Sequence, residues 1–342
     1  MSPRGALRLA GVASGLLLFV LALQMLRRGA AGLDPLFETL RIRGVGGCAA
    51  LGWLSACLLF SGSPVAALAL GLLDAGTLDP AECLAMICGS RLGASTVILG
   101  LGVLADLGRR GSRSSYVGVT TVLATAAVYL PATALALVLL RTGTLQPLSL
   151  PKGAAYDLLD GIVESILSLL PFRGLGLFLL GVGGILGAFR LIDRALPEPS
   201  SGGLLGRVSE VAFRPAVMFG LGLLVTALSL SVSVSLGILL PLTARGSIRR
   251  ENLLPYVLGA NISTFIDTLF ASLLVRSPEA FPVVLAELLS VAGVSLVLLL
   301  LAYRRFARGV DRASSYLSAS RARLLAFAAS CLACPLLLFL LA

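Results

Sequence analysis

The stretch LLPYVLGANISTFIDTLFASLL, residues 253 to 274, is long and apolar enough to cross a membrane as a helix. Its centre nevertheless carries a glycine, an amide, two hydroxyls and the carboxylate of Asp267. A helix that faced lipid would not tolerate these groups, because polar side chains without partners are costly in hydrocarbon. The stretch therefore predicts a membrane helix whose centre faces a polar interior and coordinates something there.

The composition of the whole chain indicates a polytopic membrane protein. Its 342 residues are 57% hydrophobic and 13% charged, with a mean hydropathy of +0.99, whereas a soluble domain is about one-quarter charged. The apolar runs are continuous rather than alternating, which predicts helices and not a β-barrel. Seven full spans are expected, at residues 9–27, 82–107, 115–141, 174–192, 252–275, 281–303 and 323–341.

Charge and residue usage exclude several classes of function. A net charge of +10 is typical of arginine-rich cytoplasmic loops in a membrane protein, so no nucleic-acid partner is expected. The chain has no histidine, which removes the commonest metal ligand and proton shuttle. The six cysteines lie in apolar runs and are expected to be small buried hydrophobes. With no activated nucleophile in view, no enzyme, catalytic residue, metal site or cofactor is predicted.

Two further apolar regions, 45–75 and 213–245, are interrupted near their centres by serine, glycine or proline. In the first region the arm after the break runs from Val65 to Ala75, which is about 16 Å as a helix. That is about half of the ~30 Å hydrocarbon core. Each region is therefore expected to be a re-entrant helical hairpin, with its broken tip buried in protein.

The sequence repeats at an offset of 170 positions. Residues 51–99 align with residues 221–269 without a gap, and 12 of the 49 aligned positions are identical. Seven of these are leucine, and such identities are expected by chance in a leucine-rich chain. The other five lie at hairpin tips and expected helix breaks: Gly52, Ser61, Ser63, Gly76 and Gly89, which match Gly222, Ser231, Ser233, Gly246 and Gly259.

The opening helices of the two halves also match, GLLLF from Gly15 with GLGLF from Gly174, at an offset of 159. The chain is therefore expected to be a duplication, with one unit at residues 1–150 and another at residues 174–303. An interfacial helix would join them within residues 151–173. A basic cytoplasmic loop and a C-terminal transmembrane helix would follow in residues 304–342.

Basic residues predict the orientation of the spans. With seven crossings, 18 of the 27 lysines and arginines collect on one side and eight on the other, while Arg91 lies in the membrane. The richer side is expected to be cytoplasmic, which places the N-terminus inside and the chain in the cell inner membrane, with anionic lipids at its basic loops. The two units then start from opposite sides, and inverted repeats are the architecture of secondary transporters.

These features resemble the sodium–phosphate (Na/Pi) cotransporter family. Each half has an apolar helix, a serine-containing hairpin and a glycine-bounded helix similar to the family signature GANIGTT, which GANISTF from Gly259 follows closely. The family's QSSS motifs align with Phe60 to Ser63 and with Leu230 to Ser233, where both glutamines and the central serines are replaced. In the first half the second signature reads GSRLGAS, which places Arg91 at the position of its asparagine.

The resemblance covers residues 10 to 300 and implies two inverted repeats, each with a re-entrant hairpin and a broken transmembrane helix. It also implies a symporter that moves inorganic phosphate or a similar small anion with sodium as the coupling ion. Other readings stay open: transport of another anion, altered ion coupling, or a membrane sensor or assembly protein that keeps the fold without transporting. A homodimer is left open as well.

Two sets of candidate site residues follow, each with a structural alternative. Substrate binding is expected at the hairpin tips and at the one arginine in the membrane, although a serine in a helix also bonds its own backbone. These residues are Ser61, Gly62, Ser63, Ser231, Ser233, Ser235 and Arg91. Ion binding is expected at the second signature, where interhelical hydrogen bonding is the alternative. These residues are Gly259, Asn261, Ser263, Thr264 and Asp267.

The depths of Arg91 and Asp267 in the membrane predict that these two charged side chains lie close together. Arg91 lies about nine residues from the outer end of its helix, and Asp267 lies about eight residues from the same face on a helix of opposite direction. They are therefore expected to face each other. The pair would be either a structural salt bridge or a guanidinium that replaces a bound cation or holds an anionic substrate.

Overall fold

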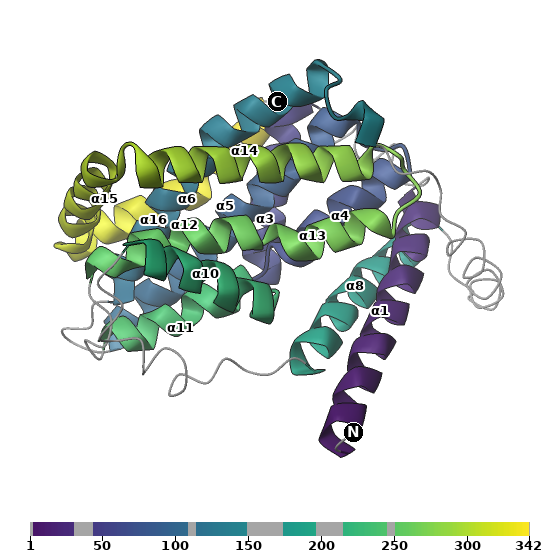
Figure 1. The fold of residues 1–342 in the computed structure, drawn as a ribbon, viewed down its shortest axis with the longest axis horizontal. Helices are drawn as coiled ribbons and strands as arrows, with labels where there is room; N and C mark the ends of the chain where they lie inside the picture. Colours follow the sequence, from purple (N-terminus) through teal and green to yellow (C-terminus); the bar gives the residue numbers. More distant parts are fainter. Residues whose placement is uncertain are drawn as a thin grey trace.

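The computed structural model describes residues 3–30, 44–108, 114–148, 174–195, 215–244 and 250–341. Within these ranges the chain is helical and contains no strand (Figure 1). Seven helices in the described ranges are long and apolar enough to cross a membrane, and each matches one of the seven predicted spans. The prediction of an all-α polytopic membrane protein is confirmed. The interfacial helix predicted within residues 151–173 lies outside the described residues.

The described helices are divided here between the two halves of the chain that the sequence compares. The first half comprises α1 (Pro3–Ala30), α3 (Gly44–Leu59), α4 (Ser63–Asp74), α5 (Pro80–Gly108), α6 (Ser114–Arg141) and the short η1 (Gln146–Leu148). The second half comprises α8 (Leu175–Ala195), α10 (Pro215–Ser229), α11 (Val232–Ala244), η3 (Arg250–Asn252), α12 (Leu253–Ser263), α13 (Phe265–Leu273) and α14 (Ala280–Leu300). Two helices end the described chain, α15 (Tyr303–Ser318) and α16 (Arg321–Leu341).

Two helix pairs pack in the same way in the two halves. α3 packs along α5, and α10 packs along α12. Glycine makes both contacts close, because an added Cβ at Gly52 would overlap the carbonyl oxygen of Met86, and one at Gly222 would overlap that of Tyr256. Both the glycines and their partners are 170 positions apart. The offset found in the sequence therefore recurs as a pair of equivalent backbone contacts.

The turns that join the short helices are also equivalent. Phe60, between α3 and α4, has a φ of 55°, and Leu230, between α10 and α11, has a φ of 49°. They are the only non-glycine residues with positive φ in the described part of the chain. A side chain in this left-handed region costs about 1–2 kcal/mol, so packing must hold each turn in place. The two residues are again 170 positions apart.

The helices that open the two halves form an antiparallel pair at one side of the bundle (Figure 1). Gly11 near the start of α1 approaches Ala195 at the end of α8, whereas Gly29 near the end of α1 approaches the backbone of Phe178 near the start of α8. Small residues along the seam let the two backbones come close, as in other membrane helix pairs. Helices that match in sequence thus run in opposite directions.

The broken helix predicted for the first half is absent. α5 is continuous through the GSRLGAS segment, so that prediction is wrong. Its glycines serve close packing instead of unwinding, because an added Cβ at Gly89 would overlap the carbonyl oxygen of Ala49, and one at Gly93 would overlap that of Trp53. The segment stays helical because its glycines let α3 pack directly against it.

The break predicted for the second half is present but small. α12 ends at Ser263 and α13 begins at Phe265. Thr264 between them keeps a helical conformation, with φ −61° and ψ −18°, and its N–H donates to the carbonyl of Ala260 at 3.1 Å. The helix is therefore interrupted at one residue rather than unwound over several.

The basic segment predicted as a cytoplasmic loop is part of helix α15. Apolar or small residues four apart, Phe306, Val310 and Ser314, point one side of this helix toward the bundle, and Val310 and Ser314 are buried. The arginines lie on exposed positions: Arg304, Arg305, Arg308 and Arg312. The segment is helical because its apolar residues recur at helical spacing, which buries one side and leaves the arginines on the other.

Candidate functional site

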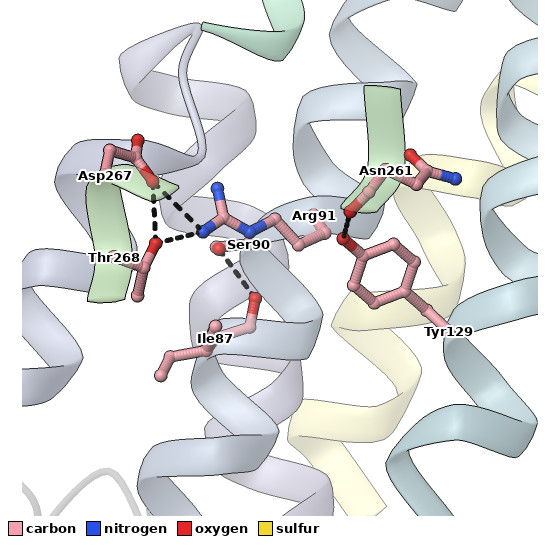
Figure 2. Close-up of polar contacts among 7 residues, drawn as sticks. All are labelled: Ile87, Ser90, Arg91, Tyr129, Asn261, Asp267 and Thr268. Atoms are coloured by element: carbon pink, nitrogen blue, oxygen red, sulfur yellow. Dashed lines mark hydrogen bonds and ion pairs between the residues drawn. The ribbon is translucent and has the colours of Figure 1, made fainter. Parts of the chain in front are cut away.

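The centre of the candidate site is Arg91, which α5 carries into the core. Its side chain is 4% exposed, and Nη2 lies 3.9 Å from Oδ1 of Asp267, whose side chain is 5% exposed (Figure 2). Nη2 also donates to the hydroxyl of Thr268, which in turn donates to Asp267 Oδ1 at 2.9 Å. The prediction that Arg91 and Asp267 face each other is confirmed. Thr268 bridges them and was not predicted.

Aromatic rings fix the other side of the arginine. The guanidinium carbon lies 5.3 Å from the centroid of the Phe265 ring, a cation–π distance. Phe265 stacks on Tyr129 of α6, with centroids 6.2 Å apart and planes at 24°. Tyr129 donates its hydroxyl to the backbone carbonyl of Asn261 at 3.0 Å (Figure 2). The rings therefore connect α5 and α6 to the helix break that follows Asn261.

The tip of the first hairpin reaches the same place. Gly62 is buried against α5, where an added Cβ would lie 2.8 Å from the carbonyl oxygen of Ser90, the residue before Arg91. Ser63 begins α4, is 7% exposed, and brings its hydroxyl next to the Asp267 carboxylate. The structure thus gathers four predicted site residues from three distant segments: Gly62, Ser63, Arg91 and Asp267.

Several buried polar atoms of this region have no hydrogen-bond partner within the described residues. They include Arg91 Nε and Asp267 Oδ2, together with the hydroxyls of Ser263 and Thr264 at the helix break. Buried polar groups are nearly always paired, so unpaired ones need an explanation. Here a donor from the guanidinium and an acceptor from the carboxylate belong to one cluster. Such a cluster offers binding atoms for an anion and for a cation.

Two residues of the second signature serve helix packing. Gly259 allows the close approach of α10, because an added Cβ would overlap the carbonyl oxygen of Phe219. Asn261 is 2% exposed and directs its side-chain amide to Thr125 of α6, with Nδ2 3.4 Å from Oγ1. For these two residues the structure matches the interhelical alternative more closely than an ion-binding role.

In the second hairpin, Ser235 bonds to Thr226 and Tyr256 and not to the Arg91 cluster. Ser235 is fully buried, where its hydroxyl accepts from Thr226 at 2.6 Å and lies 2.9 Å from the Tyr256 hydroxyl. The carbonyl of Ser231 accepts from Ser229 at 3.2 Å. Ser233 lies in α11, and its side chain is outside the described part of the structure. At the first tip, no hydrogen bond among the described residues joins the half-buried Ser61 to Arg91 or Asp267.

Glu287 on α14 is a buried carboxylate that the sequence analysis missed. It is 0% exposed, and both of its carboxylate oxygens lack a partner within the described residues. It lies only six residues inside the predicted span that begins at residue 281, which is about 9 Å deep. A carboxylate in a run as apolar as VVLAELLSV was the signal that could have found it.

The site combines a buried cation, a buried anion and hydroxyls at the meeting point of a hairpin tip and an interrupted helix. Guanidinium groups bind tetrahedral oxyanions through paired N–H donors. Carboxylate and hydroxyl oxygens suit hard cations. Comparison with protein-family models, with curated proteins and with solved structures finds no match.

Proposed function

We propose that this chain is a secondary active transporter of the inner membrane that moves phosphate or a similar small anion together with sodium. The observation that carries the proposal is the Arg91–Asp267 cluster, in which a buried guanidinium and a buried carboxylate each keep an atom free for a ligand. Ion sites near the midplane between two halves are the usual arrangement in secondary transporters.

Each charge of the cluster has a role in this proposal. Arg91 Nε donates to an oxygen of the anion, which attracts the substrate into the core and explains an arginine at this depth. Asp267 Oδ2 and the hydroxyl of Ser63 bind the sodium ion beside it. Ser263 and Thr264 supply further oxygens from the interrupted helix. Binding of each ion favours the other, because each neutralises the charge that the other brings.

Inverted repeats and re-entrant hairpins belong to the same proposal, with the N-terminus in the cytoplasm. Three observations support them. α1 and α8 match in sequence and run antiparallel. α3 and α4 have 16 and 12 residues, which at 1.5 Å each fall short of a ~30 Å core. The N–H of Gly44 donates to Glu82 at 2.7 Å, so both ends of this hairpin lie near the start of α5.

Uptake measurements test the function. The full-length chain is reconstituted into proteoliposomes and given radiolabelled phosphate, with an inward sodium gradient, with an inward potassium gradient of equal size, or with no gradient. The proposal expects accumulation with sodium alone. A panel of small oxyanions, including sulfate, then gives the anion selectivity. Absence of accumulation for every anion in the sodium arm would favour a sensor or an assembly protein.

The hairpin topology is tested by labelling. Single cysteines replace Val45, next to the start of α3, and Thr77, after the end of α4, in a chain whose six native cysteines are replaced by alanine. A membrane-impermeant thiol reagent is expected to modify both positions from the same face of intact proteoliposomes. Val45 is exposed, so access is set by the membrane and not by packing. Labelling from opposite faces would contradict the re-entrant hairpin.

Two serines that the sequence grouped together are expected to behave differently. Ser63→Ala removes a hydroxyl beside Asp267 and is expected to weaken substrate or sodium affinity several-fold, since a hydrogen bond contributes about 1 kcal/mol net. Ser235→Ala leaves the hydroxyls of Thr226 and Tyr256 short of a partner, and is expected to lower the melting temperature without changing affinity. Equal effects of the two variants on affinity would remove Ser63 from the site.

A further inference from the structure

Glu287 is not used by the proposed anion and sodium sites. It is fully buried on α14, and both carboxylate oxygens lack a hydrogen-bond partner within the described residues. An ionised carboxylate left unpaired in a membrane core is among the most costly arrangements for a side chain. Glu287 therefore has to be neutralised by a bound cation or by a proton.

The titratable groups that neighbouring helices place near Glu287 favour a proton over a bound cation. α5 and α6 pack against α14, and they bring the thiols of Cys83 and Cys88 and the phenol of Tyr129 near the glutamate. Thiols are soft groups and poor ligands for a hard cation such as sodium, which prefers several oxygens. A proton needs only the carboxylate itself.

Arg91 lies on α5, which packs against the helix α14 that carries Glu287. Its guanidinium is engaged by Asp267 and Thr268, and no lysine or arginine of the described residues forms an ion pair with Glu287. The other helices packed against α14 hold their ionisable groups elsewhere. On α12 Tyr256 lies against Ser235, on α4 Asp74 accepts from the N–H of Ser277 at 2.6 Å, and the arginines of α15 follow the C-terminal end of α14.

We propose that Glu287 is a proton-binding site, and that its proton controls how firmly Arg91 pairs with Asp267. The inference rests on the proposed function, to which it adds a proton as a second coupling ion. When the carboxylate holds the proton, Glu287 is neutral and Arg91 stays with Asp267 and Thr268. When the O–H bond breaks and the proton leaves to water, the new anion competes for the charge of Arg91. Proton binding and anion binding are then linked through one guanidinium.

Infrared spectroscopy of the purified full-length protein tests the site without relying on transport. A protonated carboxylic acid has a carbonyl stretching band that an ionised carboxylate lacks. At neutral pH the spectrum of the unmodified protein minus that of Glu287→Gln is expected to contain this band, and raising the pH is expected to remove it. Glu279→Gln is the matched control, because Glu279 is exposed just before α14 and its replacement should leave the band intact.

Two outcomes would overturn the inference. If the difference spectrum at neutral pH shows no carbonyl band, Glu287 is ionised. If the band disappears when sodium chloride is added at constant pH, sodium displaces the proton and Glu287 is a sodium site. Uptake provides a separate measurement. Phosphate itself titrates near neutral pH, so the two proteins are compared at each pH: accumulation by the unmodified protein should change more with pH than accumulation by Glu287→Gln. A chain that transports nothing would end the proposed function, while the infrared result would still decide the protonation of Glu287.

Discussion

Replacing Arg91 with glutamine is expected to abolish anion uptake and to destabilise the fold by about 3–5 kcal/mol, the usual cost of leaving one charge of a buried pair unpaired. The guanidinium meets Asp267 and Thr268 on one side and the Phe265 ring on the other. Arg91→Lys keeps the charge but loses the fork of donors that serves both contacts. It is therefore expected to fold more stably than Arg91→Gln and to remain impaired in uptake.

The companion change Asp267→Asn removes the negative charge that lies 3.9 Å from the guanidinium. The double variant Arg91→Gln, Asp267→Asn is expected to be less damaged than the sum of the two single variants, as measured by melting temperature in detergent. Its uptake is expected to stay lost if Arg91 binds the anion. Arg27→Gln is the comparison, because Arg27 lies 3.7 Å from the buried Asp74 but is itself 36% exposed, so solvent replaces part of the lost contact and a smaller loss is expected. Strict additivity would mean that Arg91 and Asp267 do not interact.

The sequence alone was sufficient to predict the membrane spans and the proximity of Arg91 to Asp267. Lipid offers no partner for backbone groups, so each span needs about 20 apolar residues and is visible as such. Depth along two helices of opposite direction then placed Arg91 and Asp267 together. These predictions succeeded because the depth of a residue in the membrane follows directly from its position along a spanning helix.

The parts that the sequence could not provide depend on packing. Gly89 and Gly93 looked like helix breakers, but their role depends on whether another backbone approaches, and α3 does. Ser235 looked equivalent to a binding serine, yet it is satisfied by Thr226 and Tyr256. The sequence does not distinguish Thr268 from other threonines in membrane helices. Its position between Arg91 and Asp267 depends on the rotamer of Arg91.

Glycine packing supports a second prediction with a large effect. Gly52→Ala and Gly222→Ala each place a methyl group on a backbone carbonyl oxygen, that of Met86 or that of Tyr256. Because backbone atoms of a packed helix cannot swing away, α3 must separate from α5, or α10 from α12. Overpacking of this kind typically costs about 1–3 kcal/mol, more than the ~1 kcal/mol that alanine gains over glycine in a helix. Both variants are therefore expected to melt at a lower temperature than the unmodified protein.

Glycines on the same two helices provide the controls. An added Cβ meets no atom within 4 Å at Gly46 of α3 or at Gly220 of α10, so alanine at either position is expected to leave the melting temperature unchanged or slightly raised. Because Gly52 and Gly222 occupy equivalent contacts in the two halves, their losses are expected to be of similar size. A Gly222→Ala variant that melts like the Gly220→Ala control would mean that α10 does not touch α12 along this seam. The packing equivalence of the two halves would then be lost, and with it the strongest structural support for a duplicated core around Arg91.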